Sequence, residues 1–255
     1  MSENIISVYV DDDREEAVRL VSKYNLIAIP VIDRDRTLKG IITVDDIIDV
    51  MEEEASEDMY KFAGTSEQER DVVEKVNPKP KEQIISSVKG RIPWLIITLI
   101  AGLLSTIMLS NLDFIMNPTY ASLVFFIPVV MGMGGNIGTQ SSALTVMALS
   151  NKDLEFSNVI REGIVGLITG IICSIIIGII IFIFMRDINI VLVVSLSLFI
   201  NMIVGAMIGA FMPVLLKKLD VDPSIISAPV IATVLDVIGI AIYLLITTIL
   251  LSKIV

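Results

Sequence analysis

The chain has 255 residues, of which 54% are hydrophobic, and its 29 acidic and 19 basic residues give a formal net charge of −10. It contains no histidine and one cysteine, Cys173. This composition excludes histidine-based zinc hydrolases, Ser-His and Cys-His nucleophile pairs, and a disulfide within one chain. The acidic balance gives no basic face of the kind that nucleic acids require, so no nucleic-acid partner is expected.

Charge is concentrated in the N-terminal third of the chain. Residues 1–91 hold 21 acids and 13 bases, whereas residues 92–255 hold 8 acids and 6 bases among many Ile, Leu, Val and Gly. No positively charged segment with an apolar run and a cleavage site precedes Val10, so no secretory signal peptide is expected. We therefore expect a small acidic cytosolic part followed by a membrane part.

Residues 1–62 are predicted to form a small α/β module. The pattern indicates a strand over 8–10, a helix over 13–24, a buried strand over 26–32, a strand over 40–43 and a helix that begins at Thr43. Asp45 and Asp46 lie in the first turn of that last helix, where acids complement the helix dipole.

The last helix of this module carries eight acids between Asp45 and Asp58 and no base. Like charges four positions apart destabilise a helix by about 0.2–0.5 kcal/mol per pair. Two interpretations stay open. One is a solvated acidic face, and the other is a face that binds divalent cations, which would relieve the repulsion.

Residues 63–91 are predicted to connect the two parts. Capping-box patterns that start at Thr65 and Ser66 predict a short helix, and the segment from Asn77 to Pro80 ends it. Residues 81–91 then predict a helix that lies at the membrane surface.

Five stretches reach the ~20 residues needed to span a bilayer, at roughly 92–112, 120–149, 159–185, 190–216 and 224–252. The fold class is therefore a mainly α membrane protein, with five transmembrane helices in a domain over 92–255 after the α/β module. The positive-inside rule predicts a multi-pass protein of the cell membrane with a cytoplasmic N-terminus and an external C-terminus. The cytoplasmic flanks would hold Lys89, Arg91, Lys152, Arg161, Lys217 and Lys218, and the external flanks Arg186 and Lys253.

The second span combines helix-weakening residues with neutral oxygen ligands. Pro128 and the glycines at 132, 134, 135 and 138 predict an interrupted helix, which at membrane depth requires burial in protein or a water-filled path. Close packing of small residues is the alternative. A cluster of polar side chains favours the path: Asn136, Thr139, Gln140, Ser141 and Ser142.

The fifth span contains a lone carboxylate, Asp236, near the middle of an otherwise uncharged stretch. An ionisable group at such depth is costly, so it commonly faces a protein interior, a water-filled path or a cation; a protonated acid in helix packing is the alternative. Ala232 and Ala228 lie on the same helix face as Asp236. In the fourth span, Asn201, Gly205 and Gly209 indicate helix packing.

Hard oxygen ligands without thiolate or imidazole favour Mg²⁺, Ca²⁺ or Mn²⁺. Magnesium is commonly held by one or two carboxylates and keeps several waters, which one Asp236 per chain would satisfy around an axis shared by two chains. We therefore expect Mg²⁺ as the transported ion.

The runs PVVMGMGGNIGTQSS and VDPSIISAPVIATVLDVIG, with the order of five spans, resemble the MgtE family of magnesium channels and transporters. The segment IPVIDRDRTLKGIITVDDIIDV resembles a CBS motif. The resemblance implies a homodimer in the lipid bilayer, with a pore on the two-fold axis lined by the second and fifth spans. It implies a pore site for hydrated Mg²⁺ at Asp236, with Ala232 and Asn136 on the pore wall. It also implies cytosolic sites for regulatory Mg²⁺ that gate the channel, at Asp49, Glu54, Glu57, Asp58 and Asp13.

The chain begins in what resembles the second CBS motif of that family, and the residues at Lys23 and Asn25 are not acidic where an acid is expected. Thr43 and Asp46 fit a T-x-x-D pattern that binds nucleotide ribose in CBS pairs, but half of the pair is missing, so nucleotide binding is a minor hypothesis. The alternatives are an exchanger or exporter of Mg²⁺, Mn²⁺ or Co²⁺ and a membrane-anchored CBS sensing module. An enzyme is not expected, because H-E-x-x-H is absent from the sequence and an aspartyl intramembrane protease needs two facing acids, for which only Asp236 is a candidate.

Overall fold

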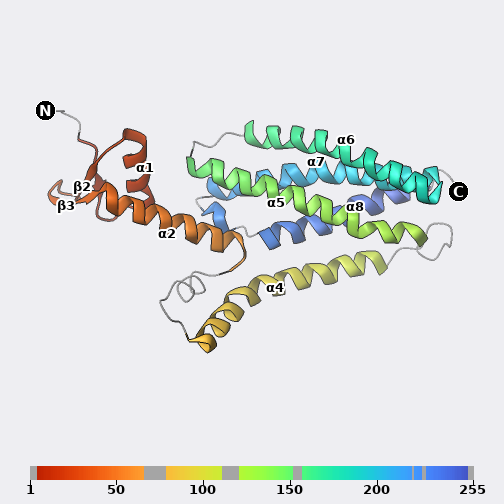
Figure 1. The fold of residues 1–255 in the computed structure, drawn as a ribbon, viewed down its shortest axis with the longest axis horizontal. Helices are drawn as coiled ribbons and strands as arrows, with labels where there is room; N and C mark the ends of the chain where they lie inside the picture. The colour runs from red at the N-terminus through yellow and green to blue at the C-terminus, as the bar shows by residue number, and fades with distance from the viewer. Residues whose placement is uncertain are drawn as a thin grey trace. The chain divides into compact units, whose positions relative to one another are not determined.

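The computed structural model describes residues 5–65, 79–110, 121–151, 157–219, 221–225 and 228–251 (Figure 1). The chain divides into two compact units, Met1–Tyr60 and Lys61–Val255. The predicted fold class is confirmed: a small α/β unit precedes five long apolar helices.

The N-terminal unit is a three-stranded sheet with two helices. Its elements are β1 (Val8–Tyr9), α1 (Arg14–Tyr24), β2 (Ala28–Ile32), β3 (Leu38–Thr43) and α2 (Val44–Phe62), of which the last two residues belong to the second unit. The strand order is β1-β2-β3, with β1 parallel and β3 antiparallel to β2. The core consists of the buried side chains Val8, Ala17, Val21, Ile29 and Ile47.

Local chemistry explains the ends of α1. The Asp13 side chain accepts a hydrogen bond from the Glu15 backbone N–H and so satisfies one of the first unpaired donors of the helix. At the other end, Asn25 adopts the left-handed conformation with φ 49°, and its N–H donates to the Val21 carbonyl. These caps turn the chain from α1 into β2.

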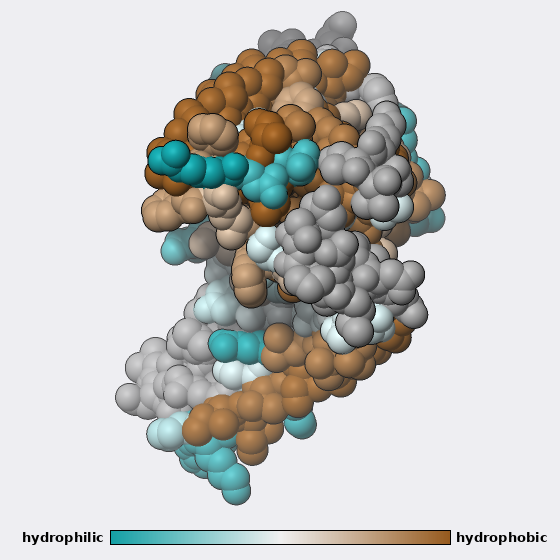
Figure 2. Space-filling model, turned by 90° about the vertical axis from the view of Figure 1, so that its right-hand side faces the viewer, coloured by the Kyte–Doolittle hydropathy of each residue, from teal (hydrophilic) through white to brown (hydrophobic). Residues whose placement is uncertain are grey.

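The second unit consists of the membrane helices (Figure 1). They are α4 (Pro80–Ser110), α5 (Ile127–Asn151), α6 (Ser157–Met185), α7 (Ile188–Lys218) and α8 (Ala228–Leu251). Short 3₁₀ turns precede α5 and α8, at η2 (Ala121–Phe126) and η3 (Pro223–Ile225). All five helices are long and apolar enough to cross a membrane, as the five predicted spans require. Hydrophobic side chains cover much of the described surface of this unit in Figure 2.

Helix α7 lies at the centre of the bundle and packs on α5, α6 and α8. Small residues permit the close approach: a Cβ added to Gly205 would lie 2.7 Å from the Gly134 carbonyl oxygen of α5, and one added to Gly209 would lie 2.7 Å from the Gly138 Cα. The interpretation of this part of the fourth span as a packing surface is therefore confirmed.

Three local expectations are corrected. Helix α5 is continuous over Ile127–Asn151 rather than interrupted. Pro128 occupies the first turn, where a backbone N–H would have no partner within the helix. The glycines at 134, 135 and 138 pack against α7 and α8. Residues 81–91 form the first turns of α4 rather than a separate surface helix. The helix predicted from Thr65 onward falls mostly on residues 66–78, outside the described part of the chain.

Candidate functional site

Asp236 lies near the middle of α8 and is partly exposed within the protomer. It lines a partly open cavity of about 350 Å³ whose lining residues belong to α4, α5 and α8. Besides Asp236 the lining consists of small, hydroxyl-bearing and apolar residues: Thr98, Ala101, Gly102, Ser105, Thr106, Leu109, Met131, Thr233 and Ile240. Asp236 therefore lies at the wall of a mainly apolar hollow that also has four hydroxyl-bearing residues.

The glycine-rich part of α5 approaches α8 closely at this point. A Cβ added to Gly135 would lie 3.7 Å from the Asp236 Oδ1 atom and 3.7 Å from the Cβ of Ala232. One turn later, the Leu235 side chain occupies the space that a Cβ of Gly138 would need. The structure thus brings together Asp236, Ala232 and the backbone of α5 beside Asn136.

The polar cluster of α5 separates onto different faces of the helix. Asn136 and Gln140 are exposed in the protomer, and Thr139 is half-buried. Ser141 and Ser142 are buried, and the Ser141 hydroxyl donates to the Glu162 carboxylate of α6 at 2.9 Å. The five polar residues therefore do not form one ligand set, and only Asn136 and Gln140 remain available on the outer face of α5.

Two buried polar side chains that sequence reasoning had not singled out for a site hold α5 in place. Asn201 of α7 is fully buried, and its Nδ2 donates to the Val130 carbonyl at 2.6 Å. A Cβ on Gly134 or Gly239 would collide with the Asn201 amide, so this side chain fills a hole shared by α5, α7 and α8. Glu162 is 3% exposed and is paired with Arg161 at 3.1 Å. Glu162 could have been singled out from the sequence, because it is an acid inside a predicted membrane span.

The acids predicted to bind regulatory Mg²⁺ lie in the N-terminal unit. Asp49 is exposed on α2, Glu54, Glu57 and Asp58 are half-buried on the same helix, and Asp13 is the N-cap of α1. Among the described residues, no three His, Cys, Asp or Glu side chains gather as a group that could hold a metal ion. The regulatory role of these acids stays a prediction.

Arg14 of α1 partly neutralises the acidic face of α2. Its guanidinium lies 3.0 Å from a carboxylate oxygen of Glu53 and 3.0 Å from one of Glu54. The charge of Glu54 and the hydrogen bond to Glu53 raise the pKa of Arg14 above its ordinary value. Arg14 of α1 thus reduces the repulsion between acidic residues of α2, a helix whose own sequence offers no base between Asp45 and Asp58.

Thr43 and Asp46 are used to cap α2. The Asp46 carboxylate accepts hydrogen bonds from the Thr43 hydroxyl at 2.7 Å and from the Thr43 N–H at 3.2 Å. These hydrogen bonds lower the pKa of Asp46. The pair therefore stabilises the start of α2 in the N-terminal unit.

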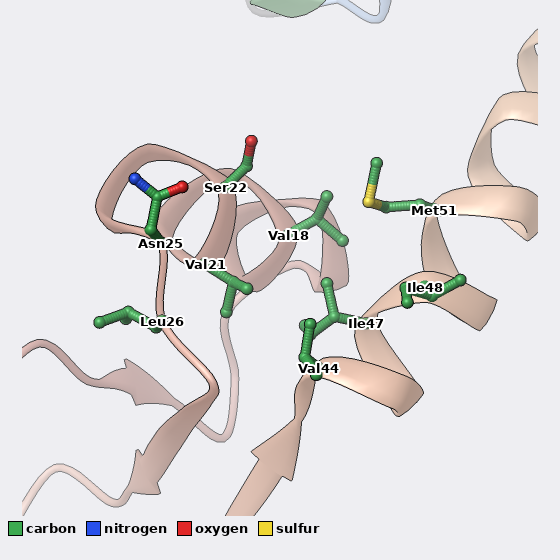
Figure 3. A pocket seen from close by; sticks show the side chains of 9 residues that line it. All are labelled: Val18, Val21, Ser22, Asn25, Leu26, Val44, Ile47, Ile48 and Met51. Atoms are coloured by element: carbon green, nitrogen blue, oxygen red, sulfur yellow. The ribbon is translucent and has the colours of Figure 1, made fainter.

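A second hollow, of about 360 Å³, lies between α1 and α2 of the N-terminal unit. Figure 3 shows apolar side chains of both helices around it, with Ser22 and Asn25 as the polar members. None of the lining residues is charged: Val18, Val21, Ser22, Asn25, Leu26, Val44, Ile47, Ile48 and Met51. This groove offers no carboxylate to a cation, whereas the hollow in the second unit has Asp236 in its lining.

The loop before α8 is held by a small polar cluster in the second unit. Asp222 accepts hydrogen bonds from the Ser224 hydroxyl at 2.7 Å and from the Ser224 N–H at 2.9 Å, and Lys61 lies 3.1 Å away. Burial opposes ionisation of Asp222, but these hydrogen bonds and the Lys61 charge outweigh it and lower its pKa. The cluster stabilises residues 221–225, which precede the helix that carries Asp236.

Both parts of the chain match known protein families. Residues 127–246 match the MgtE family model, described as a divalent cation transporter, and residues 1–53 match the CBS domain model. The protein "Magnesium transporter MgtE" of Bacillus subtilis (strain 168) is 36% identical over 252 residues, 97% of this chain and 54% of the relative. The protein of the same name from Thermus thermophilus is 32% identical over 258 residues, 100% of this chain and 55% of the relative.

The chain thus spans about half the length of the curated relatives that it matches. Both relatives carry the name of a transporter rather than an enzyme. The five apolar helices agree with a multi-pass membrane protein. The chain thus carries an MgtE-family domain at residues 127–246, after a CBS-domain match at residues 1–53.

Proposed function

We propose that this chain conducts hydrated Mg²⁺ across the membrane past Asp236. The observation that carries the proposal is a carboxylate of a membrane helix that lines a hollow together with four hydroxyl-bearing residues. Magnesium sheds its waters reluctantly, so one carboxylate that accepts hydrogen bonds from those waters matches its coordination. The relatives named as magnesium transporters support Mg²⁺ as the ion. The test is Mg²⁺ flux into liposomes that contain the purified chain.

The proposed assembly is a homodimer whose pore lies on the two-fold axis. Asn136 and Gln140 are exposed on one face of α5 in the protomer. Exposure of such amides to lipid is costly, because hydrocarbon offers them no hydrogen-bond partner. A second copy of the chain and a water-filled path would cover them and would place two Asp236 carboxylates around one path. The proposed orientation keeps the N-terminus cytoplasmic and the C-terminus external.

A cross-linking experiment tests the dimer. In a Cys173→Ser background, Asn136→Cys should give a covalent dimer with a short bis-maleimide reagent in lipid vesicles. Leu167→Cys is the matched control, because Leu167 is 43% exposed on α6 and no dimer contact is proposed there. Equal, low cross-linking of both variants would contradict the proposed interface.

The proposed regulation is inhibition by Mg²⁺ bound at the acidic residues of the N-terminal unit. We propose that Asp49, Glu54, Glu57, Asp58 and Asp13 contribute to this binding when cytosolic Mg²⁺ is high. The exposed and half-buried positions of these acids leave their carboxylates within reach of solvent ions. The excess negative charge of α2 supports the proposal, although Arg14 already pairs with Glu53 and Glu54.

Neutralising part of this face should weaken the inhibition. The combination of Glu54→Gln, Glu57→Gln and Asp58→Asn should raise the half-inhibiting internal Mg²⁺ concentration at least about tenfold, since each exposed charge near the ion contributes on the order of 1 kcal/mol. The measurement is flux into liposomes at increasing Mg²⁺ on the cytosolic side. Asp11→Asn, Asp35→Asn and Glu52→Gln together remove the same charge and should leave inhibition unchanged. Equal effects of the two triple variants would count against a specific site.

A further inference from the structure

Helix α4 contributes a hydroxyl-bearing wall to the cavity at Asp236. Thr98, Ser105 and Thr106 of α4 line it together with Thr233 of α8. On α4, Ser105 follows Thr98 by two turns, so both lie on one face of the helix. Ser105 is 7% exposed, whereas Leu99 and Leu103 on other faces of α4 are 63% and 57% exposed. Thr98 and Ser105 therefore lie on the side of α4 that lines the cavity, whereas Leu99 and Leu103 lie on its exposed sides.

The hydroxyl protons of three lining residues are already committed to the backbone. Thr98 donates to the Leu95 carbonyl at 2.9 Å, Thr106 to the Gly102 carbonyl at 2.9 Å, and Thr233 to the Pro229 carbonyl at 2.7 Å. A hydroxyl that donates its one proton keeps its lone pairs as acceptors. These oxygens and the Asp236 carboxylate therefore present acceptors to the cavity.

This pattern suits a cation that keeps its waters. The water ligands of Mg²⁺ point their hydrogens outward and need acceptors, whereas an anion needs donors. None of the described residues that line the cavity is basic. Six waters at about 30 Å³ each need about 180 Å³, and the cavity of about 350 Å³ provides that space. The wall therefore selects ions by their charge and their water shell, and it leaves the water ligands on the ion.

We propose that Thr98 and Ser105 of α4 form, with Thr233, an outer-shell binding site for hydrated Mg²⁺ beside Asp236. The inference rests on the proposed function, because it assigns further residues to the same ion path. It makes α4 a specificity-determining wall of that path within one protomer. Asp236 supplies the charge, and the hydroxyl oxygens accept hydrogen bonds from the water ligands that face α4 and α8.

The test uses hexaamminecobalt(III), a cation of similar size to hydrated Mg²⁺ whose ammine ligands donate hydrogen bonds and exchange too slowly for direct coordination. In the full chain, Thr98→Val with Ser105→Ala should raise both the half-blocking concentration of this ion and the half-saturating Mg²⁺ concentration. The expected rise is about fivefold per hydroxyl, the change that corresponds to about 1 kcal/mol for one hydrogen bond. Thr98→Ser with Ser105→Thr keeps both hydroxyls and should restore wild-type values.

Thr248→Val is the matched control, because Thr248 of α8 is exposed and its hydroxyl donates to the Leu244 carbonyl outside the cavity. A second variant tests the space itself. Gly102 lines the cavity and a Cβ added there meets nothing within 4 Å, so Gly102→Leu should occupy part of the cavity and reduce flux at least about tenfold. Leu103→Phe adds bulk on the exposed side of α4 and should leave flux unchanged.

Two results separate this inference from the proposed function. If Asp236→Asn stops flux but the α4 variants keep wild-type block and saturation, the α4 site is wrong and the path past Asp236 stands. If Asp236→Asn keeps full flux, the proposed function fails first. Loss of flux in Asp236→Asn together with weakened hexaamminecobalt(III) block in the hydroxyl variant supports both.

Discussion

Replacement of Asp236 by asparagine should reduce Mg²⁺ flux by about 10- to 100-fold or more. The carboxylate is the only charged residue among those described that line the cavity. Hydrogen bonds to a charged group contribute about 1.5–3 kcal/mol each, and 1.4 kcal/mol corresponds to a tenfold change. Asparagine keeps the size of the side chain but removes the charge, so the loss reports on electrostatics rather than on packing. The measurement is initial Mg²⁺ uptake into liposomes, followed with an internal fluorescent indicator.

Asp187→Asn provides the matched control. Asp187 caps α7, and its side chain accepts a hydrogen bond from the Asn189 N–H. Asparagine is also a good N-cap, so this variant loses one charge at little structural cost. It should retain wild-type uptake. Full uptake in Asp236→Asn, with both proteins eluting as folded assemblies, would remove Asp236 from the conduction path.

The second large effect concerns the contact between α5 and α7. Gly209→Ala should lower the apparent melting temperature by about 5–10 °C, since overpacking costs about 1–3 kcal/mol and a chain of this size shifts by a few degrees per kcal/mol. The new methyl group would overlap the Gly138 carbonyl oxygen and lie 2.7 Å from the Gly138 Cα. These are backbone atoms, so the two helices would have to separate. Because α5 also contacts Asp236, flux should fall with stability.

Gly102→Ala is the control for this substitution. It adds the same methyl group to a membrane helix, and nothing lies within 4 Å of the added Cβ. Alanine also favours the helix by about 1 kcal/mol over glycine. Thermal denaturation in one detergent should therefore rank Gly102→Ala at or above the parent chain and Gly209→Ala well below it. Equal melting temperatures for the two variants would show that α5 and α7 do not pack as described.

The number and order of the membrane helices could be predicted from the sequence because length and apolarity alone determine them. The interruption predicted in α5 was wrong for a physical reason. Glycine weakens an isolated helix, but at Gly134 and Gly138 the missing side chains make room for Asn201 and Leu235 of neighbouring helices. The glycines that predict a break in an isolated helix therefore allow neighbouring helices to pack closely in the folded protein.

Asp236 could be singled out from the sequence because its cost in a membrane is a property of one residue. Its partners could not, because α4 and α8 meet through residues more than a hundred positions apart. Thr98 and Ser105 look unremarkable in an apolar helix until the cavity is known. The contact of Arg14 with Glu53 and Glu54 could not be predicted for the same reason. The spacing of charges four residues apart describes contacts within one helix, whereas Arg14 lies on another helix.

The central claim is that hydrated Mg²⁺ passes the Asp236 carboxylate. The most direct test is Mg²⁺ uptake by the reconstituted wild-type chain under a set membrane potential, with Mn²⁺, Co²⁺ and Ca²⁺ compared and Asp236→Asn measured alongside. We predict uptake that rises with an inside-negative potential, is blocked by hexaamminecobalt(III) and is lost in Asp236→Asn. Folded wild-type protein that carries no more Mg²⁺ than empty liposomes would contradict this account.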